Sequence, residues 1–106
     1  MRYAVRVRVG ATGEPGVIER ALDEVMEELV HLAEVDARFA DPAIGADFGG
    51  GMVEFALTVD AEEGYAVPVA LAAIRSAIHK AGGGTQAWPT FPPAEAIEAK
   101  LVGSGA

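Results

Sequence analysis

Residues 2–9 alternate strictly between two kinds of side chain. One set is apolar or aromatic and comprises Tyr3, Val5, Val7 and Val9. The other set is largely basic and comprises Arg2, Ala4, Arg6 and Arg8. Because successive side chains of a strand point to opposite faces, this period of two predicts a β-strand with one buried and one open face. The rest of the chain must therefore cover one face of a sheet.

The next residues change from a period of two to a helical period. A turn at residues 10–13 precedes Pro15, which the first turn of a helix tolerates, and Glu14 stands beside the positive end of the helix dipole. Apolar residues then recur at spacings of three and four, and they are Ile18, Leu22, Val25, Leu29 and Leu32. A helix is expected to about Ala33, with its acidic residues on the opposite, solvated side.

A pair of strands is indicated after this helix. Residues 35–40 alternate briefly, and Asp41-Pro42 is expected to end that strand. Residues 52–60 alternate more clearly and predict the strongest strand after the first. Between the two strands, the glycine-rich residues 41–51 are expected to form a long hairpin connection.

The last third of the chain predicts a second helix and a short strand. The helix is expected to begin near residues 65–67, because Pro68 fits only in a first turn, and to end at the glycines 82–84. Residues 85–88 are short enough to be an edge strand that Pro89 stops. A weak helix is expected over residues 94–102, followed by a disordered end.

The predicted elements follow one another in the order βαββαβ. With right-handed crossovers, each strand-helix-strand unit leaves a gap that a strand of the other unit fills. The expected fold class is therefore α+β, a ferredoxin-like βαββαβ sandwich with a four-stranded antiparallel sheet and two helices on one face. A swapped or open four-strand arrangement is the main alternative. Residues 1–90 are expected to form this domain, and residues 91–106 a C-terminal extension with a short helix and a disordered end.

Composition limits the functions that such a domain can serve. The 106 residues contain no cysteine, which excludes disulfides, thiolate zinc sites and cysteine nucleophiles. The formal net charge of −8 disfavours nucleic acid and anionic membranes as partners, because their phosphates need clustered cations. The predicted open face also lacks the stacking aromatics of RNA-binding domains with this topology. Neither a signal peptide nor a membrane anchor is visible, so a cytoplasmic location is expected.

Half of the eight basic residues form an arginine stripe, which we define as Arg2, Arg6, Arg8 and Arg38. The predicted topology places this stripe on the polar sides of the first two strands, on the face that the helices leave open. As a site, it would accept a carboxylate, a phosphate or an acidic peptide, because the guanidinium fork matches such groups. As plain surface, it would pair with Glu54, Asp60 and Asp36. The sequence leaves both interpretations open.

The turn into the first helix is a second candidate site for an anion. Residues 12–18 would expose backbone N–H groups at a helix N-terminus. Pro15-Gly16-Val17-Ile18, placed after a first strand in this element order, resembles the Pro-Gly-x-Leu turn of ACT domains. The resemblance implies a regulatory module that binds amino acids, with Gly16 where the ligand approaches the backbone. Gly13-Glu14 departs from the polar Asp or Asn often found just upstream, and a carboxylate there would repel an anionic ligand.

The region after the second helix carries a resemblance and a candidate interface. Residues 73–83 and the following Trp88-Pro89 resemble small uncharacterised proteins of high-GC bacteria. That resemblance spans most of the chain and implies no activity. Trp88 and Phe91 would cap the core and pack the C-terminal segment onto the domain. Alternatively, with the last edge strand, they would form a homodimer contact by pairing edges or by covering the open face.

Chemistry-bearing residues form no catalytic pattern in this sequence. His31 and His79 end different helices at opposite edges of the predicted domain, so a metal site shared by the two is not expected. The carboxylates of the first helix lie on a solvated face, whereas acid-base catalysis needs one of a pair desolvated. No serine has a nucleophile context. We therefore expect no catalytic residue, no metal site and no cofactor.

These observations favour a non-enzymatic binding or regulatory module that recognises a small anionic ligand. The candidate ligand-binding residues are Arg2, Arg6, Arg8, Arg38, Gly13 and Gly16, and the candidate interface residues are Trp88 and Phe91. The alternative is a structural or protein-interaction module that acts through its acidic first helix or its C-terminal aromatic segment. A homodimer is expected in either case.

Overall fold

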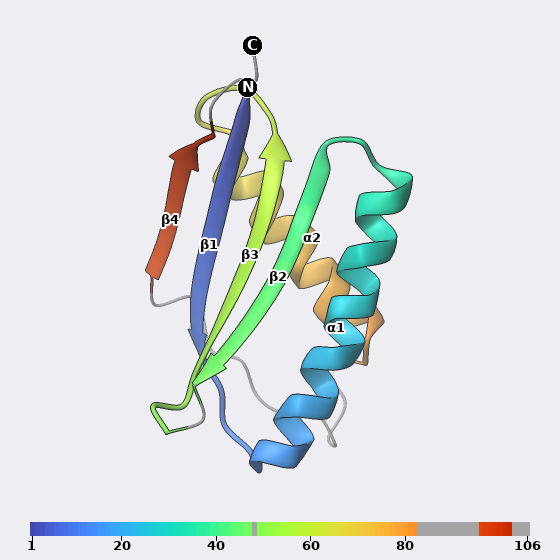
Figure 1. Cartoon of the computed structure of the whole chain (residues 1–106), viewed down its shortest axis with the longest axis vertical. Helices are drawn as coiled ribbons and strands as arrows, with labels where there is room; N and C mark the ends of the chain where they lie inside the picture. The colour runs from blue at the N-terminus through green and yellow to red at the C-terminus, as the bar shows by residue number, and fades with distance from the viewer. Residues whose placement is uncertain (48, 83–95, 103–106) are drawn as a thin grey trace.

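The computed structural model describes residues 1–47, 49–82 and 96–102 of the chain (Figure 1). Within these residues the elements follow the order βαββαβ. Their bounds are β1 (Arg2–Gly10), α1 (Pro15–Val35), β2 (Phe39–Asp47), β3 (Met52–Asp60), α2 (Ala66–Lys80) and β4 (Ala96–Leu101). The element order predicted from the sequence is therefore confirmed.

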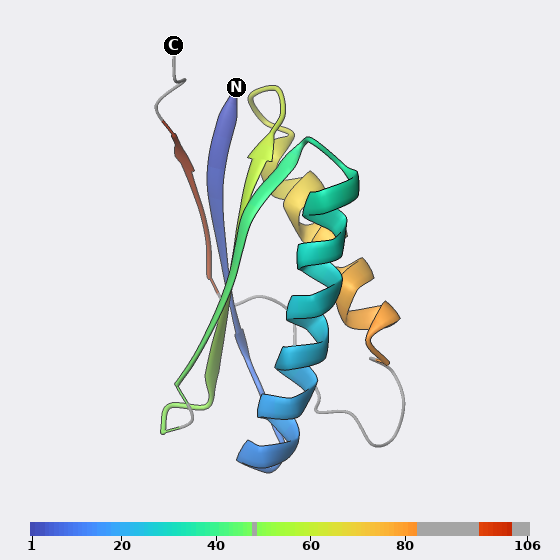
Figure 2. The same cartoon turned by 45° about the vertical axis from the view of Figure 1, so that its right-hand side comes forward.

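The four strands form one antiparallel sheet in the order β2-β3-β1-β4. The first and third strands along the chain are thus the two central strands, and β2 and β4 are the edges. Both helices lie against the same face of the sheet, and no described element covers the other face (Figure 2). This arrangement is the ferredoxin-like sandwich that the sequence predicted.

The core lies between the sheet and the two helices. β1 directs Val5, Val7 and Val9 toward the helices, and β3 places Leu57, Phe55 and Val53 opposite them in register. These six residues are at most 7 % exposed. α1 adds Ile18, Ala21, Leu22, Val25 and Leu29, whereas α2 adds Ala66, Ala70, Ala73, Ile74 and Ala77. Apolar residues at a helical spacing thus cover apolar residues at a period of two.

The second strand lies later in the chain than the sequence predicted. Helix α1 continues to Val35, and the backbone N–H of Asp36 donates to the carbonyl oxygen of Leu32 at 2.9 Å. The second strand was predicted at residues 35–40, and only Phe39 and Ala40 of that segment belong to β2. Its alternation is misleading, because Val35 is 67 % exposed and Phe39 is the one apolar residue of that segment that is buried.

A bulge carries β2 through the two residues that were expected to end it. The register with β3 shifts between Ala40 and Ala43, so Asp41 and Pro42 together take the place of one residue. Asp41 has φ 50°, a left-handed conformation that Asp adopts more readily than most residues. Pro42 lacks an N–H group, which an edge strand tolerates at a bulge. The long connection predicted at residues 41–51 is accordingly a strand to Asp47 and a shorter turn.

The fourth strand also differs from the prediction. β4 occupies Ala96–Leu101, where a helix was predicted over residues 94–102. That helix is wrong, because the segment pairs antiparallel with β1, from Ala96 opposite Arg8 to Leu101 opposite Tyr3. Part of the predicted C-terminal extension thus forms an edge of the sheet. The strand predicted at residues 85–88 and the disordered end at residues 103–106 lie outside the described residues.

Candidate functional site

The face of the sheet opposite the helices is built by alternate residues of the strands. In Figure 1, α2 passes behind the strands, so this open face is turned toward the viewer. β1 contributes Arg2, Ala4, Arg6 and Arg8, and β3 sets Asp60, Thr58, Ala56 and Glu54 opposite them in the same order. β4 places Lys100 opposite Ala4 and Glu98 opposite Arg6. The face therefore mixes charged side chains with small ones.

Arg8 forms a cross-strand ion pair. Its Nε lies 3.6 Å from Oε1 of Glu54, which is its register partner on β3. The two side chains are 62 % and 36 % exposed, so water weakens the pair. Arg8 nevertheless forms a cross-strand pair with Glu54, as expected if the stripe is plain surface.

Arg38 pairs with a carboxylate close to it in sequence. Its Nη2 lies 2.8 Å from Oδ2 of Asp36, and its Nε donates to both carboxylate oxygens at 3.1 and 3.2 Å. The backbone N–H of Arg38 also donates to Oδ1 at 3.0 Å. These hydrogen bonds hold the pKa of Asp36 below its usual value, and those from the side chain of Arg38 have the largest effect. The side-chain hydrogen bonds also raise the pKa of Arg38. Arg38 was predicted on the second strand, but it lies in the turn before β2, where Asp36 of the same turn binds it.

Arg2 and Arg6 differ from the other two arginines of the stripe. Within residues 1–47, 49–82 and 96–102, neither guanidinium group forms an ion pair. Asp60 is the register partner of Arg2, but its Oδ1 lies 3.1 Å from the amino group of Met1. Arg6 faces Ala56 on one side and Glu98 on the other, without an ion pair to Glu98. Pairing across the sheet therefore accounts for only part of the stripe.

The floor between Arg2 and Arg6 is made of short side chains. Ala4 separates the two arginines on β1, and Thr58 and Ala56 lie opposite Ala4 and Arg6 on β3. All three short residues are half-buried. On β1 and β3, the two arginines thus flank short side chains with one hydroxyl group, whereas β4 adds Lys100 beside Ala4 and Glu98 beside Arg6.

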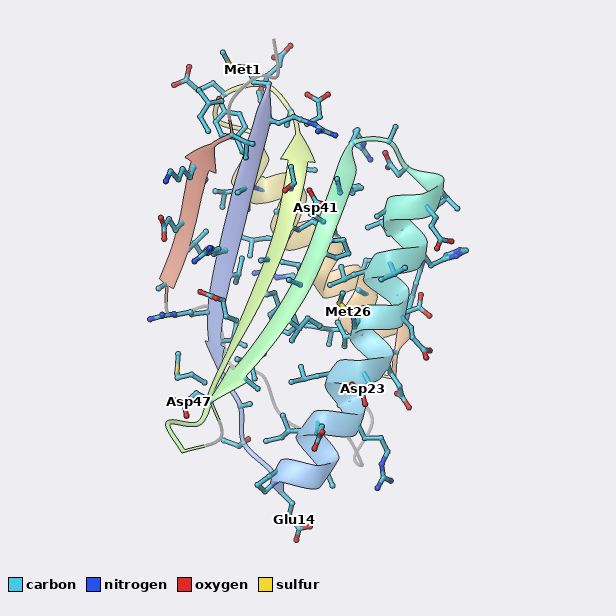
Figure 3. All side chains as sticks on the ribbon, viewed as in Figure 1. Met1, Glu14, Asp23, Met26, Asp41 and Asp47 are labelled. Carbon is cyan, nitrogen blue, oxygen red and sulfur yellow. The ribbon has the colours of Figure 1, made fainter. Side chains whose placement is uncertain are left out.

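A hollow of about 300 Å³ lies at the other end of the open face. Its charged lining residues are Arg8, Asp47 and Glu54, and Gly45, Ala46, Met52 and Val53 complete it. Two carboxylates against one arginine make this hollow a poor site for an anion. In Figure 3 the labelled Asp47 marks this end, far from the labelled Met1 beside Arg2.

The turn before α1 is separate from the unpaired arginines. Glu14 precedes the helix without a side-chain cap, and Gly13 has φ 139°, which favours glycine. A Cβ at Gly16 would meet no atom within 4 Å, so this position is open to solvent. Figure 3 places Glu14 and Met1 at opposite ends of the molecule. The structure therefore does not bring Gly13 and Gly16 together with Arg2.

Sequence reasoning missed the two charged residues that β4 adds to the open face, Glu98 and Lys100. A signal was present, because Ile97, Ala99 and Leu101 alternate with these two residues at a period of two. The short segment was interpreted as a weak helix instead. The predicted interface residues Trp88 and Phe91 lie outside the described residues.

Other kinds of site find little support in the part of the chain that the structure describes. No group of three or more histidine, aspartate or glutamate residues there could hold a metal ion. No helix of the described ranges is both long and apolar enough to cross a membrane. The arginine stripe therefore remains the main candidate.

Comparison with known proteins adds the fold and nothing finer. No family model matches the sequence, and no curated protein matches it. Among solved structures, the chain is similar to a protein from Chloroflexus aurantiacus J-10-fl described as "putative Antibiotic biosynthesis monooxygenase". The TM-score is 0.59 and the sequences are 13 % identical, over 100 % of this chain and 97 % of the other. The likeness supports the ferredoxin-like fold.

Proposed function

We propose that this chain is a non-enzymatic binding or regulatory module that recognises a small anionic molecule on the open face of its sheet. The observation that carries the proposal is the contrast within the stripe. Arg8 and Arg38 are paired with carboxylates, whereas Arg2 and Arg6 form no ion pair in the described part of the chain. These two arginines lie on one strand of an acidic protein, and their guanidinium groups can bind an anion.

The spacing of the two arginines indicates the kind of anion. They are four residues apart on one strand, so their Cα atoms are separated by about 14 Å at the usual rise of a strand. Two long side chains at this separation can converge above Ala4 or engage the two ends of one ligand. Carboxylates and phosphates both accept paired hydrogen bonds from a guanidinium group. A small dicarboxylate, tricarboxylate or phosphate ester fits this arrangement.

The structural neighbour does not extend the proposal to catalysis. Its description names a monooxygenase, but a likeness at 13 % identity concerns the fold alone. Unrelated functions occur on one fold, and function follows from the site residues. The open face of this chain presents arginines beside carboxylates and small residues, and the two arginines without ion pairs in the described part of the chain suit binding.

Calorimetric titration at low salt tests the proposal with citrate, succinate, inorganic phosphate and adenosine monophosphate as probes. The test variant is Arg2→Ala/Arg6→Ala. The matched control is Arg20→Ala/Arg75→Ala, which removes two exposed helix arginines and gives the same net charge. We expect at least one probe to bind, and the test variant to bind it about tenfold or more weakly, because charge-assisted hydrogen bonds are lost.

Two outcomes would contradict anion recognition at this face. One is that no probe in the panel binds to the wild-type protein. The other is that both double variants lose affinity equally, which would show a general effect of net charge. Raising the salt concentration should weaken the wild-type interaction, since the two arginines are exposed.

The acidic face of α1 supports a second candidate function, a protein-interaction module. A shallow hollow of about 570 Å³ lies on this helix, lined by Asp23, Met26, Glu27, Val30, His31 and Glu34. Figure 3 labels Asp23 and Met26 on α1, and Met26 lies on the side of the helix that faces β2. An apolar strip between carboxylates fits a basic amphipathic helix. A Lys/Leu model peptide should bind to the wild type and not to Asp23→Lys/Glu27→Lys, and absence of binding to the wild type would exclude this candidate.

A further inference from the structure

β4 is an edge strand whose outer side no described element covers. The strand order places β4 at one margin of the sheet, and Figure 1 shows no described element beyond it. All six of its residues are exposed, and the large apolar side chains Ile97 and Leu101 are 41 % and 51 % exposed. A strand edge with these properties pairs readily with another strand.

The main chain of β4 shows which residues face the free edge. The N–H of Val102 donates to the carbonyl oxygen of Arg2 at 2.9 Å, so the main chain of Val102 is directed toward β1. Main-chain groups alternate between the two sides of a strand, so the even-numbered residues of β4 are also directed toward β1. The residues directed outward are then Ile97, Ala99 and Leu101. Their N–H and C=O groups can continue the ladder.

The side chains of β4 are self-complementary about Ala99. When two copies pair antiparallel with Ala99 opposite Ala99, Glu98 of each copy lies opposite Lys100 of the other on the open face. Ile97 then lies opposite Leu101 on the side of the helices. Opposite charges and apolar side chains that face each other directly across strands stabilise their pairing. A register centred on Glu98 or Lys100 would instead place like charges together.

From this pattern we infer that two copies of the chain associate through antiparallel pairing of their β4 strands, centred on Ala99. The contact is isologous and closes after two copies, because each strand presents the same surface to the other. The two sheets become one, with both arginine stripes on the same face. The opposite edge is not equivalent, because the bulge at Asp41 and Pro42 interrupts β2.

This contact involves residues 96–102, whereas Trp88 and Phe91, where the sequence predicted an interface, lie outside the described residues. It is also independent of anion recognition, because none of the three outward-facing residues belongs to the arginine stripe. Loss of one property therefore does not imply loss of the other.

Charge reversal on β4 tests both the association and its register by sedimentation equilibrium. We expect the wild type to show twice its chain mass of 10.9 kDa. Glu98→Lys places two lysines opposite each other and Lys100→Glu places two glutamates opposite each other. Each single variant should self-associate roughly tenfold or more weakly, since two attractive cross-strand pairs become repulsive. The double variant Glu98→Lys/Lys100→Glu should associate as the wild type does.

Mixing the two single variants gives the sharpest result. A Glu98→Lys chain and a Lys100→Glu chain restore both opposite-charge pairs, so the mixture should form a heterodimer that neither variant forms with itself. The matched controls Glu19→Lys and Arg20→Glu make the same charge changes on the exposed side of α1 and should not alter the mass.

Three results would overturn the inference. They are a wild type that stays monomeric at every concentration, single reversals that leave the mass unchanged, and a mixture that fails to restore association. Circular dichroism of each variant should match the wild type, because both side chains are exposed.

Discussion

The two faces of the sheet are made by the same strands and differ in almost every property. On the covered face, Val5 and Val7 of β1 and Phe55 and Leu57 of β3 are at most 2 % exposed and pack against the helices. On the open face, the alternate positions carry arginines, carboxylates and alanines. Packing specifies the covered face and leaves the open face free to carry a site.

The open face is itself divided. On β1, Arg8 is paired with Glu54, whereas Arg2 and Arg6 form no ion pair among the described residues. The fourth stripe arginine, Arg38, pairs with Asp36 in the turn before β2. The covered face has no comparable division, because no polar or charged residue is buried in the described part of the chain. One face therefore carries stability, and a subset of the other carries the proposed function.

The largest expected effect comes from truncating a side chain on the covered face. Phe55→Ala should lower the free energy of unfolding by about 3–5 kcal/mol, because it leaves a cavity in a closely packed core. Thr58→Ala, a truncation on the open face of the same strand, should cost less than about 1 kcal/mol. Urea unfolding followed by circular dichroism measures both. Equal losses for the two variants would show that the two faces are not energetically distinct.

Much of the fold was predictable because most elements keep a regular period. β1, β3 and both helices follow their expected spacing, and their order determines the sandwich. β2 was misplaced because its bulge shifts the alternation by one residue. Phe39 and Ile44 both face the core although they are five residues apart. β4 carries a period of two at residues 97–101, but the segment is short, and its side chains are all exposed in the folded chain, so burial does not reinforce the pattern.

An intermediate effect is expected at the bulge, which keeps both halves of β2 facing the core. Asp41→Ala should lower the free energy of unfolding by about 1 kcal/mol, because alanine tolerates the left-handed conformation poorly. Asp41→Gly is the matched variant and should be nearly neutral, since glycine adopts this conformation freely. Thermal unfolding of the pair checks the prediction. An alanine variant as stable as the glycine variant would contradict this role for residue 41.

The candidate site was predictable only in part. The alternation of β1 places Arg2, Arg6 and Arg8 on one face, as the sequence indicated. Which of these arginines forms an ion pair could not be predicted from the sequence. The answer depends on the register between β1 and β3 and on other cations that compete for the same carboxylates. Asp60 is opposite Arg2, yet the amino group of Met1 lies against its carboxylate. Arg38 pairs with Asp36, two residues away in the same turn, although the sequence also offers Glu54 and Asp60 as partners.

The smallest effect is expected for Asp36→Asn, which removes the carboxylate that pairs with Arg38. The folded state lowers the pKa of Asp36, so the ion pair stabilises the protein above the unfolded value of about 3.8 and is lost as pH falls through the folded pKa. The melting temperature of the variant should therefore be slightly below that of the wild type at pH 7 and equal to it near pH 2. A difference that persists at pH 2 would mean that the pair is not its cause.

The most direct test of the account is the position of an anion on the sheet. Nuclear magnetic resonance of the ¹⁵N-labelled protein during titration with citrate reports each backbone amide separately. We predict that the shifts concentrate at residues 2–6 of β1 and 56–58 of β3, and that the arginine side-chain signals move with them. Shifts confined to residues 13–18, at the start of α1, or no shift on the sheet at all, would contradict the assignment of the site to Arg2 and Arg6.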